Sequence, residues 1–119
     1  MNFLNKINDL FSSIDEMNAD KFITFLSDDC VFTFGNYPPA IGKKATFDSV
    51  DAFFKSITGL QHHSIQIIES GDYIIARGIS KYTRQNGTQL EVGFCNVFQI
   101  KESLIKEYTI YIDLSQLYI

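Results

Sequence analysis

Apolar residues recur at three- and four-residue spacing in two long stretches of the chain, which indicates amphipathic helices. The first stretch predicts a helix over about residues 2–17, whose buried face is formed by Leu4, Ile7, Leu10, Phe11, Ile14 and Met17. A short second helix is expected to open at Asn18-Ala-Asp20 and to end at Ser27-Asp-Asp29. A third helix is expected from about Ala45 to Ile57, with a buried stripe of Phe47, Val50, Phe53, Phe54 and Ile57.

Alternating apolar residues mark the strands. The first strand is predicted at Cys30–Phe34, and four longer ones follow at Ser64–Ser70, Tyr73–Arg84, Gln89–Lys101 and Leu104–Leu114. Asn86-Gly87 is a strong hairpin signal between two of them. Helices followed by a meander of strands predict a single α+β domain over residues 1–119. A strongly curved antiparallel or mixed sheet would close over the helices and leave a cone between them.

The segment from Phe32 to Gly42 joins the first strand to the third helix through a rigid loop. Pro38 and Pro39 fix φ and donate no backbone N–H, so the loop can neither become helix nor pair as a central strand. We expect it to form the lip of a pocket and to hold Asn36 and Tyr37 there.

Composition narrows the partners. Eleven Phe residues in 119 predict an interior lined by phenylalanine, and a net charge of −4 argues against nucleic acid. The N-terminus has no basic and apolar leader pattern, and no run of 18 apolar residues occurs, so we expect a cytoplasmic protein without a membrane partner. Cys30 and Cys95 lack the spacing of a zinc site and are interpreted as free thiols, with a cross-link between two strands as the alternative.

Four motifs, together with the order of elements, resemble the SnoaL-like branch of the nuclear transport factor 2-like (cystatin-like) superfamily. They are Phe34-Gly-Asn-Tyr-Pro-Pro-Ala-Ile-Gly42, Ile57-Thr-Gly-Leu-Gln-His62, Tyr82-Thr-Arg-Gln-Asn-Gly87 and Ile110-Tyr-Ile-Asp113. The resemblance covers nearly the whole chain and implies a cone-shaped fold. It does not imply one reaction, because relatives include polyketide cyclases, isomerases, epoxide hydrolases and pure binding or assembly modules.

The chain departs from two well-known chemistries of that superfamily. The resemblance implies that the base carboxylate of ketosteroid isomerases would fall near Phe34, and that their acidic oxyanion partner would fall near Asn96. Their helix-borne tyrosine would fall near Phe11 or Ser12, and the last-strand carboxylate of epoxide hydrolases near Ile110. Neither constellation is therefore expected.

Strand parity predicts which residues face the cone. On Leu90–Ile100, the face that carries Phe94 and Phe98 is the better candidate for the pocket, which makes Asn96 its polar exception. Asn96 would bind a ligand or, equally, hydrogen-bond neighbouring backbone. The full set of expected ligand-binding residues is Phe32, Phe34, Asn36, Tyr37, Phe54, Phe94, Phe98, Tyr108 and Ile110.

Histidine and aspartate supply the candidate acid–base groups. His62 and His63 are expected at the start of a strand and so point in opposite directions; a histidine in the resembling proteins commonly follows Gly-Leu-x, which matches His62. His62 would act in proton transfer or hydrogen-bond the Pro-Pro loop. Two adjacent strand histidines do not make a metal site. Asp113 at a strand end favours a structural hydrogen bond over a role as base.

These observations support two main functional hypotheses. In the first, the protein is a cyclase- or isomerase-type enzyme for a small hydrophobic, carbonyl-bearing molecule: His62 moves the proton, and Asn96 and Tyr37 hold the oxygen. In the second, the same cavity binds a hydrophobic ligand without catalysis. A pure assembly module would fill the cone with its own Phe side chains. No cofactor is expected, since nucleotide-binding glycine loops are absent, and the outer sheet face is expected to form a homodimer.

Overall fold

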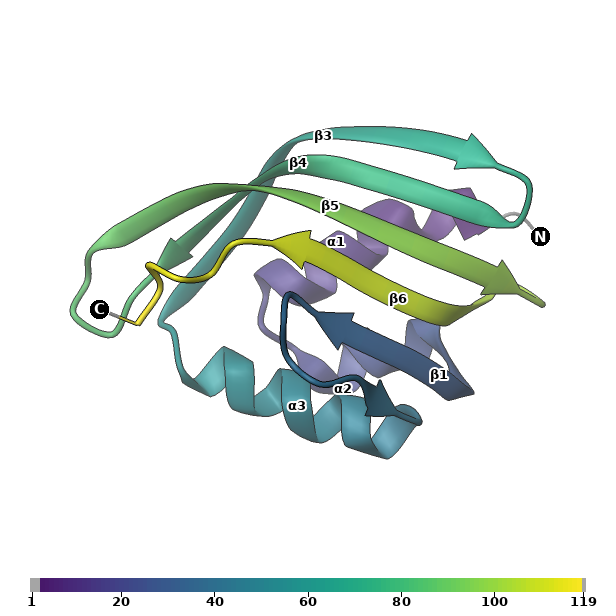
Figure 1. The fold of residues 1–119 in the computed structure, drawn as a ribbon, viewed down its shortest axis with the longest axis horizontal. Coiled ribbons are helices and arrows are strands. Elements are labelled where there is room, and N and C mark those ends of the chain that lie inside the picture. Colours follow the sequence, from purple (N-terminus) through teal and green to yellow (C-terminus); the bar gives the residue numbers. More distant parts are fainter. Residues whose placement is uncertain (1–2, 119) are drawn as a thin grey trace.

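The computed structural model describes residues 3–118 as an α+β domain, which confirms the predicted fold class (Figure 1). The helical part comes first and is interrupted by two strands, which lie between its fourth and fifth elements. Its elements are η1 (Phe3–Lys6), α1 (Ile7–Asp15), α2 (Ala19–Phe22), η2 (Ile23–Phe25) and α3 (Lys43–Lys55). The strands are β1 (Leu26–Phe34), β2 (Ala40–Ile41), β3 (Gly59–Ser70), β4 (Tyr73–Thr83), β5 (Gln89–Lys101) and β6 (Leu104–Ile112).

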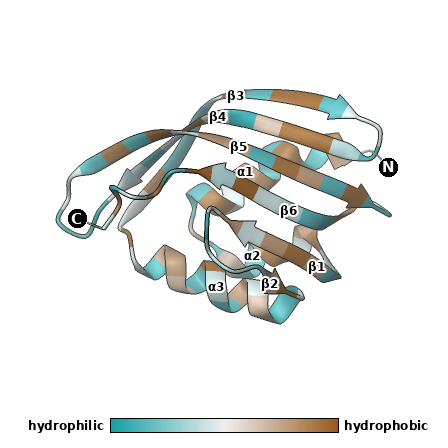
Figure 2. Ribbon diagram, viewed as in Figure 1, coloured by the Kyte–Doolittle hydropathy of each residue, from teal (hydrophilic) through white to brown (hydrophobic). Residues whose placement is uncertain are grey.

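The strands form one mixed sheet in the order β2-β1-β6-β5-β4-β3. β1 runs parallel to β6, and all other neighbours are antiparallel. The sheet curves over the helices, which lie on its inner side (Figure 1). Apolar and polar residues alternate along β4 and β5 (Figure 2), because one face covers the helices and the other carries no helix.

Several element boundaries differ from the predicted ones. The helix expected over residues 2–17 begins as a 3₁₀ turn and is α-helical only over Ile7–Asp15. The first strand begins at Leu26, because Leu26 already pairs with Ile105 of β6 before a register shift. β3 begins at Gly59, five residues before the predicted start, so that both histidines lie inside the strand. The polar run Gln61-His62-His63 hides this part of β3 from a search for apolar alternation.

The core lies between the inner sheet face and the helices. Its largest cluster contains phenylalanines from every part of the chain: Phe3, Phe11, Phe22, Phe25, Phe32, Phe54, Phe94 and Phe98. A smaller cluster of Ile57, Tyr82 and Leu117 is formed where the C-terminal segment packs against the sheet. No helix within residues 3–118 is long and apolar enough to cross a membrane.

β3 contains a bulge in its pairing with β4. The register shifts between His63 and Gln66, and Ser64 takes a left-handed backbone conformation with φ of 57°. Gly78 of β4 lies directly beneath, and a Cβ atom there would be 2.8 Å from the His63 carbonyl oxygen. The absence of a side chain at Gly78 thus allows the two strands to approach at the bulge.

Candidate functional site

A cavity lies between the inner sheet face and the helices, inside the cone. It is lined mainly by aromatic and aliphatic side chains: Ile14, Phe22, Phe32, Phe34, Val50, Phe53, Phe54, Leu60, His62, Ser80, Tyr82, Phe94, Asn96, Tyr108 and Ile110. The volume of the cavity that the centre of a water molecule can occupy is about 40 Å³. This volume is far below the roughly 300–1,000 Å³ of pockets for drug-sized ligands. The cavity therefore suits a small molecule, and a larger ligand would require its side chains to move.

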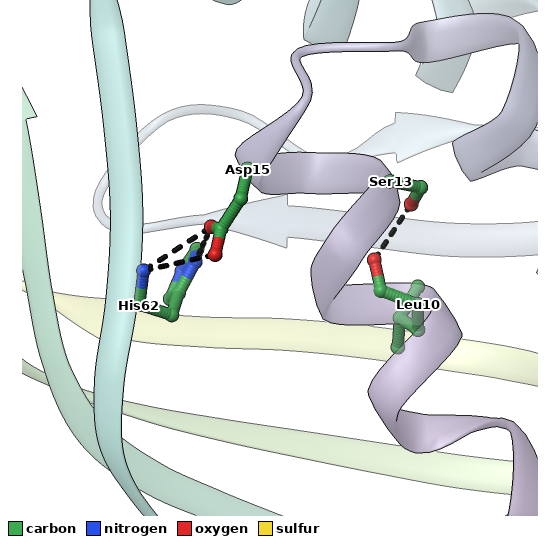
Figure 3. Close-up of polar contacts among 4 residues, drawn as sticks. All are labelled: Leu10, Ser13, Asp15 and His62. Carbon is green, nitrogen blue, oxygen red and sulfur yellow. Dashed lines mark hydrogen bonds and ion pairs between the residues drawn. The ribbon is translucent and has the colours of Figure 1, made fainter.

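The acid–base group of this cavity is a histidine–aspartate pair. Asp15 is the last residue of α1, and its Oδ1 lies 2.6 Å from Nδ1 of His62 on β3 (Figure 3). The His62 backbone N–H also donates to both carboxylate oxygens, at 3.2 Å. Because a carboxylate only accepts hydrogen bonds, the proton between the two side chains belongs to Nδ1.

The His62 ring is held in place by aromatic neighbours. Its side chain is 7% exposed, and its ring packs edge-on against Phe11 and Phe94 with centroids 5.0 and 5.1 Å away. With Nδ1 bound to Asp15, Nε2 is the ring nitrogen left to meet a ligand. His62 thus combines a fixed ring, a fixed tautomer and a place in the cavity wall.

His63 points to the opposite face of the sheet. Its Nε2 lies 3.2 Å from Glu91 Oε2, and its Nδ1 lies 2.9 Å from Ser64 Oγ. These groups are exposed on the outer face, away from the cavity. The two histidines therefore have separate surroundings.

Three polar atoms in the cavity wall are buried without a hydrogen-bond partner among residues 3–118. They are Asn96 Oδ1, Ser80 Oγ and Tyr108 OH. The alternative in which Asn96 is satisfied by neighbouring backbone is therefore not realised at its carbonyl oxygen. A buried polar atom left unpaired costs about 1–3 kcal/mol, so each of them is a position where a ligand or water gains by binding.

Two phenols of the cavity wall remain protonated over a wide pH range. Burial raises the pKa of Tyr82 to about 12, although the nearby Ser80 hydroxyl offsets part of the rise without forming a well-aligned hydrogen bond. Complete burial raises the pKa of Tyr108 well above its usual range. Both side chains therefore keep an O–H that can donate to a ligand oxygen.

The structure brings most of the expected site residues together at this cavity. Phe32, Phe34, Phe54, His62, Phe94, Asn96, Tyr108 and Ile110 all line it. Phe98 does not: it is fully buried behind the wall, with its ring centroid 4.6 Å from that of Tyr108.

The Pro-Pro loop lies elsewhere than expected. Asn36 and Tyr37 border a separate surface hollow, together with Gly35, Ile112, Asp113, Leu114 and Ser115. Tyr37 is 54% exposed, and its ring reaches the cavity only through contact with Phe34, at 6.4 Å between centroids. The sequence left open whether His62 acts in proton transfer or hydrogen-bonds this loop; among the described residues, its Nδ1 and backbone N–H bind Asp15 instead.

Sequence reasoning missed several residues of the site, above all Asp15, which does not line the cavity itself but binds His62, which does. One signal was available, since Asp15 is four residues after Phe11 and so shares the buried face of the helix. Ser80 and Tyr82 are polar residues on the inner face of β4 and follow from the same strand parity that identifies Asn96. Neither the helix spacing nor the strand parity shows which residue from another element contacts these side chains.

The remaining candidates have structural surroundings. Asp113 accepts a hydrogen bond from the Ser115 backbone N–H at 2.9 Å, which holds the pKa of Asp113 below its usual value. This is the structural bond that the sequence favoured. Cys30 and Cys95 are free thiols, so the alternative of a cross-link is not realised. Within residues 3–118 no group of three or more His, Cys, Asp or Glu side chains is placed to hold a metal ion.

The sequence profile of the SnoaL-like domain matches residues 7–108. The chain belongs to the SnoaL-like family. No curated protein sequence matches this chain. Solved structures share the fold at low identity. An NTF2-like protein of unknown function from Burkholderia pseudomallei has a TM-score of 0.90 at 14% identity, over 100% of this chain and 99% of its own.

Two further similar structures carry proposed activities. A proposed polyketide cyclase from Xanthomonas campestris has a TM-score of 0.87 at 16% identity, over 96% of this chain and 92% of its own. A proposed isomerase from Bacillus subtilis has a TM-score of 0.83 at 19% identity, over 95% and 90%. At this identity the likeness establishes the fold of this SnoaL-like chain and leaves its chemistry to the residues of the cavity.

Proposed function

We propose that this SnoaL-like protein binds a small hydrophobic, carbonyl-bearing molecule in its cavity and acts on it as a cyclase- or isomerase-type enzyme. The observation that carries the proposal is the Asp15–His62 pair, which leaves Nε2 as a proton acceptor in an apolar wall. The activities proposed for two similar structures, a cyclase and an isomerase, are of the same general kind.

The chemistry assigns a separate task to each group. Asp15 fixes the His62 tautomer with its proton on Nδ1, so Nε2 takes a proton from the carbon next to the ligand carbonyl. The carbonyl oxygen gains negative charge as that proton leaves, and the Asn96 Nδ2–H and the Tyr108 O–H would donate hydrogen bonds to it. The surrounding phenylalanines exclude water and strengthen these contacts.

Deuterium exchange offers a direct test with a simple probe. Acetophenone is incubated with the protein in deuterated buffer, and the loss of its methyl protons is followed by NMR. We expect exchange about 10²-fold or more above that in buffer. His62→Gln should abolish the enhancement, whereas His63→Gln, which changes the neighbouring residue on the outer face, should retain it. Equal exchange rates for the parent protein and His62→Gln would refute the role of His62 as the base.

A non-catalytic binding module is the second candidate, and the small volume of the cavity favours it. An aromatic-filled cone of about 40 Å³ leaves little room for a substrate to rearrange. In that case acetophenone would bind, as seen by shifted NMR signals of Phe94 and Asn96, but its methyl protons would exchange no faster than in buffer. A pure assembly module would show neither binding nor exchange.

We also propose that the outer face of the sheet pairs two copies of the chain. Ile75, Ile79 and Val97 are half-buried on this face, where no helix covers them, and Tyr111 is 62% exposed beside them. Ile75 and Val97 are cross-strand partners, and the exposed Arg77 separates them from Ile79. Apolar side chains on an open sheet face favour self-association. Sedimentation should give a dimer that Tyr111→Lys converts to a monomer; a monomeric parent protein at high concentration would contradict this assignment.

A further inference from the structure

We propose that residues 114–118 form a strap that limits the length of the ligand in the central cavity, and that Arg84 sets how firmly this strap is closed. The strap supports one end of the cavity wall, and a ligand longer than acetophenone is accommodated only when the strap opens. This inference rests on the proposed binding of a small hydrophobic molecule, because it concerns the same cavity.

The strap follows the last strand and lies at one end of the cone. β6 ends at Ile112, and residues 114–118 belong to no helix or strand. They turn toward the hairpin between β4 and β5 and toward the end of α3 (Figure 1). Leu117 is the one fully buried residue among them, at 1% exposed. The contact of the strap with the core therefore depends mainly on this side chain.

Leu117 packs behind one wall of the cavity. It forms a buried cluster with Ile57 and Tyr82, and the partly buried Phe53 and Leu60 pack against the same cluster. Tyr82, Phe53 and Leu60 line the cavity, whereas Leu117 does not. Leu117 thus fills the space into which these three side chains would have to move to make room for a longer ligand.

The bonds that hold the strap are few and lie at or near the protein surface. The Arg84 guanidinium donates to the carbonyl oxygens of Gln116 and Leu117 at 2.9–3.2 Å. The Tyr118 hydroxyl lies 2.7 Å from Oγ of Ser56 at the end of α3. The cavity-lining residues themselves belong mostly to helices and strands, whose backbones are hydrogen-bonded along their length. Segments with few buried contacts open first, so this end of the cavity yields at the lowest cost.

The small volume of the cavity, about 40 Å³, makes this opening necessary for a longer ligand. A ligand that requires the open strap binds with an affinity reduced by the fraction of molecules in which the strap is open. A weaker strap raises this fraction and so tightens the binding of long ligands alone. Arg84 does not line the cavity, and it therefore acts on ligand length only through the strap.

The experiment compares two ligands that differ only in chain length. Dissociation constants are measured by NMR titration for acetophenone and for 1-phenylhexan-1-one, which carries four more methylene groups. The longer ketone is expected to bind the parent protein no more tightly than acetophenone, although each further buried methylene would otherwise favour binding. Arg84→Ala should tighten the binding of the longer ketone about tenfold and change that of acetophenone by less than about twofold. Arg77→Ala, which removes an exposed arginine of β4 that binds Gln66, should change neither.

A second measurement follows the strap directly. The Leu117 backbone N–H donates to the Leu114 carbonyl oxygen at 3.0 Å, so its hydrogen exchange reports the opening of the strap. Saturation of the parent protein with 1-phenylhexan-1-one should speed this exchange, whereas acetophenone should not. Tyr118→Phe removes only the hydroxyl that meets Ser56 and serves as the milder variant if Arg84→Ala does not fold. It should tighten the binding of the longer ketone about threefold.

Each other outcome overturns a defined statement. Equal binding of the longer ketone to the parent protein and to the strap variants overturns the role of the strap, while the proposed binding of acetophenone stands. The same conclusion follows if Arg77→Ala tightens this binding as much as Arg84→Ala, or if the bound longer ketone leaves the Leu117 amide unchanged. A longer ketone that binds the parent protein much more tightly than acetophenone overturns the limit on length. If neither ketone binds the parent protein or any variant, the proposed function itself fails, and the inference fails with it.

Discussion

Asp15 Oδ1 lies 2.6 Å from His62 Nδ1 and connects the end of α1 to the first half of β3, 47 residues later in the chain. The same carboxylate accepts the His62 backbone N–H, so one side chain fixes both the ring and the strand beneath it. The pair therefore stabilises the fold and also orients the His62 ring. Its structural part can be measured without any knowledge of the substrate.

Asp15→Asn should lower the free energy of unfolding by about 1–3 kcal/mol, because His62 loses a charged acceptor for two donors. Urea unfolding measures the change. Asp9→Asn alters an exposed aspartate of the same helix and should change stability by less than about 1 kcal/mol. Equal effects of the two substitutions would show that the bond to His62 adds little.

Gly78→Ala should destabilise the protein by about 1–3 kcal/mol, because a Cβ at this position would lie 2.8 Å from the His63 carbonyl oxygen, a backbone atom that cannot move freely. Gly93→Ala is the matched control on the neighbouring strand, since its nearest atom would be 3.9 Å away. It should change stability by no more than about 0.5 kcal/mol. Thermal unfolding of both variants tests the close approach at the bulge.

Arg84→Ala should cost about 1–3 kcal/mol by releasing the C-terminal segment. The Arg84 guanidinium donates to the carbonyl oxygens of Gln116 and Leu117 at 2.9–3.2 Å, next to the buried Leu117 side chain. Arg77→Ala removes an exposed arginine whose Nε donates to the exposed Gln66 side chain at 2.8 Å, and should be nearly neutral. Hydrogen exchange should show faster opening of the Leu117 amide in Arg84→Ala only.

High pH should destabilise the fold through its buried phenols. Between the usual tyrosine pKa of about 10 and the folded pKa of about 12 for Tyr82, the unfolded chain has lost a proton that the folded chain keeps. The free energy of unfolding should therefore fall by about 1.4 kcal/mol per pH unit for Tyr82 in this window. Urea unfolding near pH 10 and 11 should show a shallower decline in Tyr82→Phe, with the remaining slope from Tyr108. Identical slopes would contradict the burial argument.

The fold class followed from local signals. Helix spacing, strand alternation and Asn86-Gly87 all act within a few residues, so a single sequence reveals them. Parity also identified the inner face of β5 and β6, because neighbouring residues of a strand must point to opposite sides. The early start of β3 escaped detection, since its polar residues pair with β4 instead of following an apolar pattern of their own.

The sequence by itself thus determined the α+β architecture, the SnoaL-like family and the residues that face the cone. Only the tertiary structure decided that Asp15 meets His62, that Ser80 shares the cavity with Asn96, and that Asn36 and Tyr37 border another hollow. These relationships depend on how far the sheet curves and where α1 crosses β3. Periodicity within one element carries no information about either, because both result from packing between residues that are distant in the chain.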